Sequence, residues 1–272
     1  MKGQRGHSLA VFLFLMSLLI GGLTHPTEAY ADTPHCGTVG NETWTAGGNI
    51  HVVTCDVTVP PNVTLTIAAG AIVKFKEGAR LIVNGTLKAQ GTPAQRIYFT
   101  SFKDDSVGGD TNADGALSTP QVQDWGWLEF NSPAPGSLSH ITIRYTGYDF
   151  VSSRTYRAAI YVANYVVPTL EDIDFSCETP NSVCRRNVAN AIQLPGGTLA
   201  TNVNLVHYPD LPYLIPNDWV IPSGVTLTIA PGVILKFKEG ARLIVNGTLK
   251  AQGTSAQRIY FTSFKDDSVG GD

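Results

Sequence analysis

Charged residues, methionine and cysteine are all scarce in this chain of 272 residues. Charged residues make up only 15% and the formal net charge is −3, so the chain offers no basic field that would attract nucleic acid. Low charge combined with 43% hydrophobic residues excludes a largely disordered chain. Two methionines beside 27 glycines and 16 prolines disfavour a helical bundle. The composition is typical of an extracellular β protein with a large core.

Catalytic motifs are also lacking. No G-x-S-x-G nucleophile motif is present. The histidines beyond the N-terminal segment are His35, His51, His140 and His207, and none neighbours both a nucleophile and an acid. His140 stands in a strand pattern, where a structural or solvent-facing role is favoured over that of a general base. The acids Glu171, Asp172 and Asp174 follow one another on one strand, which favours a solvated surface over a paired catalytic site for sugar hydrolysis.

The N-terminus has the pattern of a secretory signal peptide. Lys2 and Arg5 precede an apolar run over 9–23, and Ala29-Tyr30-Ala31 supplies a small-x-small cleavage site. A run of 15 residues is shorter than the roughly 20 that a spanning helix needs, which disfavours the alternative of a retained anchor. We therefore predict cleavage after Ala31, a secreted or cell-surface location, and no membrane span in the mature chain.

All four cysteines, Cys36, Cys55, Cys177 and Cys184, lie in the exported part. An even count in an oxidising compartment indicates disulfides, for which three pairings are possible. Proximity in the sequence favours Cys36–Cys55 and Cys177–Cys184. A zinc site is disfavoured because the spacing is not C-x-x-C and no histidine cluster accompanies it.

A long internal repeat dominates the sequence. Residues 63–110 recur at 225–272 with an offset of 162, and only four of the 48 positions differ. The first copy continues past Asp110, whereas the second stops at Asp272. We interpret the chain as a truncated piece of a longer, modular protein.

Period-two alternation of apolar and polar residues predicts β-strands throughout the repeat. The breaks are turn dipeptides such as Glu77-Gly78 and Asn84-Gly85. Apolar strand positions return about every 16 residues, at Leu65, Leu81 and Ile97. Later strands are predicted at 127–130, 138–145, 159–162, 170–175, 191–194 and 203–206. Such spacing fits a sandwich, a barrel or a solenoid, and the long repeat favours the solenoid.

The sequence also resembles a known fold family. The run VTLTIAAGAIVKFKEGARLIVNGTLKAQGTPAQRIYFTS, the segment Asp124-Trp125-Gly126-Trp127 with LSHITIRYTG after it, and AIYVANYVVPTLEDIDFS are similar to rungs of bacterial right-handed parallel β-helix proteins. These are the pectate-lyase-like, secreted or cell-surface repeat proteins. The resemblance covers nearly all of 57–206 and resumes at 220, departing where Trp127 replaces a usual glycine.

The resemblance implies an all-β, right-handed parallel β-helix that is capped at its N-terminus and truncated at its C-terminus. The expected divisions are a signal peptide over 1–31, a cap over 32–56, a first block over 57–212 and an incomplete second block over 213–272. Within one rung, Leu170, Ile173 and Phe175 are expected to point inward, with Asp172 at a bend between faces.

The loop after Phe102 carries a motif typical of calcium sites. Asp110, Asn112 and Asp114 precede a glycine in the pattern D-x-[DN]-x-[DN]-G, and Asp104 and Asp105 offer further oxygens. The match to an EF-hand is incomplete, since the glutamate expected at the twelfth position and the flanking helices are lacking. The alternative is an acidic, glycine-rich surface insertion. If calcium binds, its expected role is to order the long loop rather than to catalyse a reaction.

Taken together, these features predict a non-catalytic, secreted or surface-displayed β-helix segment that acts as a stalk or adhesin-like interaction surface. Its expected partners are polysaccharides or other cell-surface components, and a group of tyrosines could stack on sugar rings or form an external ladder without a ligand. These are Tyr145, Tyr148, Tyr156, Tyr161 and Tyr165. The alternative function is a polysaccharide lyase or glycoside hydrolase with a groove on one face, because one fold hosts both enzymes and binding proteins.

Overall fold

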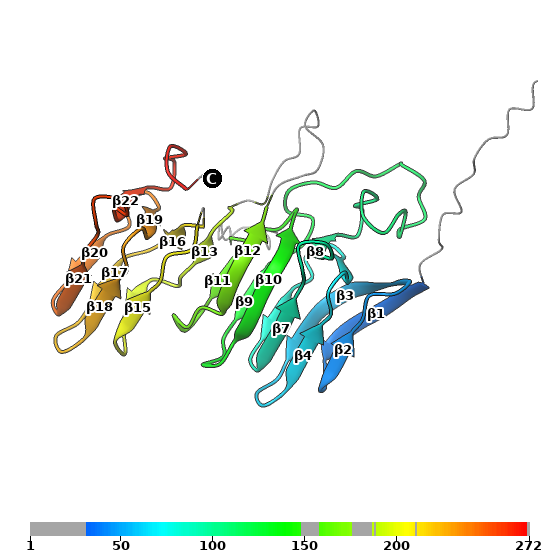
Figure 1. The fold of residues 1–272 in the computed structure, drawn as a ribbon, viewed down its shortest axis with the longest axis horizontal. Coiled ribbons are helices and arrows are strands. Elements are labelled where there is room, and N and C mark those ends of the chain that lie inside the picture. Colours follow the sequence, from blue (N-terminus) through cyan, green and yellow to red (C-terminus); the bar gives the residue numbers. More distant parts are fainter. Residues whose placement is uncertain (1–30, 148–157, 176–186, 188, 210, 271–272) are drawn as a thin grey trace, which may run out of the picture.

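The computed structural model describes every residue except 1–30, 148–157, 176–186, 188, 210 and 271–272 (Figure 1). The described residues form β-strands and no α-helix, so the prediction of an all-β protein is confirmed. It follows that no described helix is long and apolar enough to cross a membrane. The predicted signal peptide, apart from Ala31, and the predicted Cys177–Cys184 pair lie outside the described residues.

The strands are short and are spread evenly along the chain. In the first half they are β1 (Ala31–Thr38), β2 (Glu42–Trp44), β3 (Asn49–Val59), β4 (Thr64–Ile67), β5 (Ile72–Phe75), β6 (Leu81–Val83), β7 (Thr86–Gln90), β8 (Ile97–Ser101), β9 (Leu128–Phe130) and β10 (Gly136–Ile143). In the second half they are β11 (Ile160–Val162), β12 (Thr169–Asp174), β13 (Ile192–Gln193), β14 (Gly197–Thr198), β15 (Val203–Leu205), β16 (Tyr213–Ile215), β17 (Trp219–Ile221), β18 (Thr226–Ile229), β19 (Ile234–Phe237), β20 (Leu243–Val245), β21 (Thr248–Ala251) and β22 (Tyr260–Ser263).

Strands that follow one another in the chain do not pair with each other. Instead β4 pairs in parallel with β7, β5 with β8, and β6 with β9. Three strands therefore make one turn, and each turn hydrogen-bonds to the next (Figure 1). This arrangement of parallel strands is consistent with a β-helix or solenoid.

The turn is longer than the spacing of 16 residues suggests. Leu65 lies beside Leu87, 22 residues further on, and not beside Leu81. Leu81 lies beside Val57 and Leu128, in the third strand of the turn that begins with β4. The recurrence every 16 residues thus compares different faces of the stack and does not equal the length of a turn.

The core is a continuous stack of inward-pointing side chains. Alternate residues of a strand point to opposite faces, so each short strand contributes only two or three side chains to the interior. Leu87 and Phe99 are fully buried, and the ring of Phe75 stacks on Trp125 with 4.0 Å between centroids. The predicted inward positions of the 170–175 rung are also confirmed, since Leu170 is buried and Ile173 and Phe175 pack against the core.

One bend of the turn is built from residues with unusual backbone angles. Asp172 has φ 48° and His140, at the same bend one turn earlier, has φ 51°. A Cβ added to Gly91 would lie 2.5 Å from the carbonyl oxygen of His140, so only glycine fits there. Arg96 fastens this bend by donating from Nη1 to the Asp172 carboxylate at 2.6 Å and from Nη2 to the Ile141 carbonyl at 2.7 Å. The predicted bend at Asp172 is confirmed.

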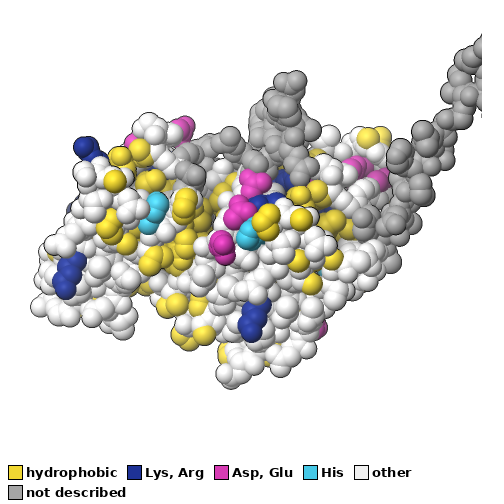
Figure 2. All heavy atoms as spheres, in the orientation of Figure 1, with side chains coloured by type: hydrophobic (Ala, Val, Ile, Leu, Met, Phe, Trp, Pro, Cys, Tyr) yellow, Lys and Arg dark blue, Asp and Glu magenta, His cyan; other side chains and the backbone are white. Residues whose placement is uncertain are grey.

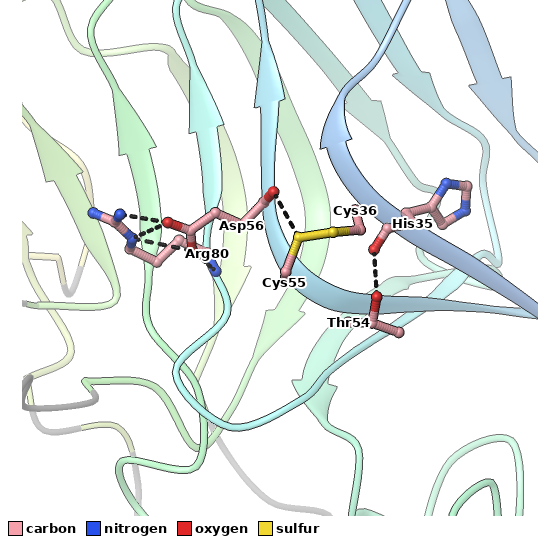
Figure 3. Close-up of a disulfide and its surroundings, with 6 residues drawn as sticks. All are labelled: His35, Cys36, Thr54, Cys55, Asp56 and Arg80. Carbon is pink, nitrogen blue, oxygen red and sulfur yellow. Dashed lines mark hydrogen bonds and ion pairs between the residues drawn. A yellow bond between two sulfur atoms is a disulfide. The ribbon is translucent and has the colours of Figure 1, made fainter.

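Residues 32–56, predicted as a cap, form further strands of the same stack. β1 pairs in parallel with β3, and β2 with β4. Cys36 and Cys55 form the predicted disulfide, which joins β1 to β3 across a Cα–Cα distance of 5.0 Å (Figure 3). A cross-link over 19 residues stabilises by about 3 kcal/mol through the loss of unfolded-state entropy.

Aromatic rings close the N-terminal end of the core. Trp44 is 2% exposed, and its ring stacks on those of His35 and His51 at centroid distances of 4.0 and 5.3 Å. The two histidines are hydrogen-bonded to each other at 3.0 Å, and Trp44 donates to Glu42. Burial and the neighbouring His51 lower the pKa of His35 to about 4, and burial lowers the pKa of His51 as well.

The two copies of the repeat occupy different faces of the stack. In the first copy β5 pairs with β3 and β8. Its counterpart in the second copy, β19, belongs instead to the third column, the run of parallel strands β6, β9, β11, β13, β16, β19 and β22. Its strand β6 follows β5 in the chain and pairs on its other side with the end of β3. The repeat length therefore does not equal a whole number of turns, and the same sequence packs on either face.

The second copy is also less buried than the first. Phe99 and Val83 are fully buried, whereas their counterparts Phe261 and Val245 are 47% and 45% exposed. β20, β21 and β22 each have a strand partner on one side only among the described residues. Identical side chains therefore contribute differently to stability in the two copies.

This difference predicts unequal effects of one substitution at matched positions. We expect Phe99→Ala to lower the free energy of unfolding by about 3–5 kcal/mol, because it leaves a cavity in the core. Phe261→Ala should cost less than about 1 kcal/mol, because its ring is half exposed. Urea unfolding of the exported chain measures both values, and equal losses would contradict the assignment of burial.

The histidine pair predicts a pH dependence at the N-terminal end. Because folding lowers the histidine pKa values, the unfolded chain binds more protons, so stability falls as pH drops from about 6.5 towards 4. We expect hydrogen exchange in β1 and β2 to quicken at pH 5 relative to pH 7, after correction for intrinsic rates. His35→Gln should remove most of this difference. An unchanged pH effect in that variant would assign it to other groups.

Candidate functional site

A long acidic loop, residues 102–127, connects β8 to β9 and covers the outer side of β5 at Lys74. Lys74 lies in β5 beneath this loop and is fully buried, although it alternates with the inward Val73 and Phe75. Its ammonium donates to the carbonyl oxygen of Gly109 at 2.8 Å and to Oγ1 of Thr111 at 2.7 Å. An outward-pointing lysine is therefore enclosed by the loop that it holds.

Two buried carboxylates anchor the base of the loop. Asp104 is 1% exposed, accepts hydrogen bonds from Thr100 and Ser106, and lies 3.7 Å from the guanidinium of Arg144. Asp124 accepts from Ser101 at 2.6 Å and pairs with Lys103 at 2.8 Å. Asp104, a predicted calcium ligand, thus has its oxygens engaged in holding the loop to β8.

Three other predicted ligands converge at the outer part of the loop. Carboxylate oxygens of Asp105, Asp110 and Asp114 all lie within 4.8 Å of one another. One oxygen of Asp105 and the amide oxygen of Asn112 are buried and have no hydrogen-bond partner among the described residues. The structure therefore brings together Asp105, Asp110, Asn112 and Asp114 and leaves two of their oxygen atoms unsatisfied.

Local turn geometry holds these side chains in place. The carboxylate of Asp110 accepts from the backbone N–H groups of Asp114 at 3.1 Å and Gly115 at 2.8 Å. Asp114 accepts in turn from the Asn112 amide at 2.9 Å. Ala113 and Gly115 adopt φ values of 56° and 74°, which wind the backbone tightly enough for the acids to face one another.

The acidic cluster is incompletely neutralised. Burial and the neighbouring carboxylates of Asp110 and Asp114 raise the pKa of Asp105, and Lys74 offsets only part of this effect. Burial lowers the pKa of Lys74, although the surrounding acids oppose that shift. A hard cation takes oxygen ligands and would remove the remaining repulsion, so the chemistry of this donor set fits calcium.

The other residues considered as functional candidates lie elsewhere. Tyr145 and Tyr161 are buried, and Tyr165 donates to the carbonyl oxygen of Gly196 at 2.6 Å, so these three do not form an exposed ladder. Tyr148 and Tyr156 fall outside the described residues. Among the acids of β12, Asp172 is engaged by Arg96.

Sequence reasoning missed Lys74 as part of the site. Strand alternation assigns Lys74 to the outside of the stack, and it does not reveal that a distant loop covers this position. The one available signal in the sequence is that a strand with a lysine precedes an acidic loop in each copy. In the second copy this lysine, Lys236, is likewise buried.

Comparison with known proteins gives little guidance. No family model matches the chain, and no solved structure matches it. The protein named bark beetle from Drosophila melanogaster is 35% identical over 71 residues. That match covers 26% of the chain and 2% of the Drosophila protein, so the likeness is confined to a short segment and shows no family.

The electrostatics of the cluster predict the effect of Asp105→Asn. Because folding raises the pKa of Asp105, its ionised form is disfavoured in the folded state, and this repulsion costs stability at pH 7. In a chelating buffer we expect Asp105→Asn to raise the urea midpoint. Asp267→Asn, the matched change in the second copy, should leave it unchanged. A lower midpoint for Asp105→Asn would show that the carboxylate is stabilising without a cation.

Proposed function

We propose that this chain is an exported, right-handed parallel β-helix segment that acts without catalysis as a stalk or interaction surface. In this proposal the signal peptide is removed after Ala31, and the protein is adhesin-like or associated with the cell envelope. Its partners would be polysaccharides or other cell-surface components. The family resemblance of the rung sequences and the parallel stacking of the strands both support this assignment.

The carrying observation is the third column, which passes through both copies of the repeat. Its strands from β6 to β22 pair in parallel without a break, although the copies contribute different strands to it. A fold that accepts the same segment on different faces requires only contact between neighbouring turns. Such a fold can be lengthened by duplication, which suits a spacer better than an enzyme that needs one fixed constellation.

An activity screen tests the non-catalytic role. The exported chain is incubated with a panel of acidic and neutral polysaccharides, with calcium and with a chelator, and new reducing ends and unsaturated sugars are measured. We expect no release above the level of a heat-denatured sample. Calcium-dependent cleavage of any member would overturn the proposal and favour the lyase or hydrolase.

We further propose that the acidic loop binds one calcium ion through Asp105, Asp110, Asn112 and Asp114. The two unsatisfied oxygens and the raised pKa of Asp105 support this site. The ion would order the loop over Lys74 and would take no part in a reaction. Calorimetry should give one site per chain, lost in Asp114→Ala and kept in Asp267→Asn. No heat, or an unchanged signal in Asp114→Ala, would overturn it.

A further inference from the structure

The parallel sheets are interrupted between β12 and β15, near the end of the first block. Among the described residues β12 pairs only with β10, while β15 pairs only with β18. The third column alone crosses this junction, through the pairing of β11 with β13 and of β13 with β16. One edge of β12 and one edge of β15 are thus left without a strand partner in the described part of the chain.

A groove lies between these two edges. It consists of a hollow of about 570 Å³, lined by Thr169 of β12 and by Val203 and Asn204 of β15, and an adjoining hollow of about 340 Å³ beside 170–173. Tyr208 lines both hollows. Figure 2 shows hydrophobic surface in the middle of this face, next to a short row of acidic side chains over β12. We call this feature the seam groove.

The lining of the seam groove combines apolar and acidic groups. Val166 and Val206 are each 39% exposed, and both line the larger hollow. Tyr208 spans the groove, donating from its hydroxyl to the carbonyl oxygen of Pro168 at 3.1 Å. Glu171 is exposed and lines the smaller hollow. The groove therefore offers apolar contacts along its length and a negative charge at one end.

The backbone of β15 has hydrogen-bonding groups directed away from its partner strand. The carbonyl of Leu205 accepts from Ala230 beyond β18, so Leu205 directs its backbone groups towards that strand. Alternate residues of a parallel strand bond to opposite neighbours, so Asn204 directs its N–H and C=O to the groove side. Unpaired strand edges of this kind are templates for an added strand.

We propose that the seam groove binds an extended polypeptide segment by strand addition between β12 and β15. This inference deepens the proposed role as an interaction surface and rests on it. The added strand would join the sheet that contains β10 and β12 to the sheet that contains β15 and β18. Main-chain hydrogen bonds would supply affinity, while the valines and Glu171 select apolar side chains and a basic residue. A saccharide has no regular row of N–H and C=O groups to pair with an open strand edge such as that of β15 at Asn204, which makes a peptide the better match.

Binding of a defined probe to the full exported chain tests the proposal. The probe is a fluorescent octapeptide of alternating valine and lysine, which presents apolar side chains on one face and charge on the other. Anisotropy should show saturable binding, and the amides of β12 and β15 should gain protection in hydrogen exchange. Val166→Lys and Val206→Lys, both at exposed positions, should weaken binding at least tenfold, while Val245→Lys at the far end of the stack should not.

Two further probes separate strand addition from simple charge attraction. An analogue with alternate N-methylated valines keeps its charge but cannot donate on one edge, and we expect at least tenfold weaker binding. Equal binding of the two peptides, no binding at all, or tighter binding of a neutral oligosaccharide at the same valines would each overturn the proposal. None of these outcomes bears on the polysaccharide cleavage assay, so failure here is distinct from failure of the non-catalytic role.

Discussion

The parallel hydrogen bonding between successive turns is the constraint on which the rest of the structure depends. No strand of three to five residues holds its shape alone, and each is fixed by the turns on either side. The inward side chains are stacked by the same register, so Leu65 lies on Leu87 and Val83 lies beside Phe130. In β22, which pairs on one side only among the described residues, the ring of Phe261 is half exposed. Stability is therefore local and cumulative along the stack.

The positions of strands and of the bend at Asp172 could be predicted from the sequence. Which strands lie side by side in the stack could not. The resemblance to β-helix rungs predicted the inward residues of 170–175, and the Cys36–Cys55 pair followed from proximity. The turn length does not follow from the sequence pattern, because alternation describes each strand alone and contains no information on which strand lies next to it. The strands β1 to β3 were not predicted, because residues 32–56 were expected to form a cap over the first rung.

The candidate site likewise contains residues that the sequence predicted and residues that it did not. The spacing of Asp110, Asn112 and Asp114 predicted a cluster of oxygen ligands, and the carboxylates of Asp110 and Asp114 do converge. Asp104 and Lys74 have roles set by tertiary contacts, because one holds the loop to β8 and the other lies beneath it. The seam groove has no sequence signature either, since it lies where β12 and β15 each have one strand partner among the described residues. Long insertions and junctions are thus where this fold acquires features that differ between turns.

The central claim is that the two blocks form one stack through β13, and hydrogen exchange of its amides tests this most directly. The amide of Leu194 donates to Leu214 at 3.0 Å, which ties β13 to the second block, and that of Ile192 donates at 2.9 Å to Pro212, the residue just before that block. Both amides should exchange as slowly as that of Leu128, which donates to Ala159 at 3.0 Å within the first block. Exchange of Ile192 and Leu194 at the rate of an unstructured peptide would contradict the account, because the blocks would then be independent.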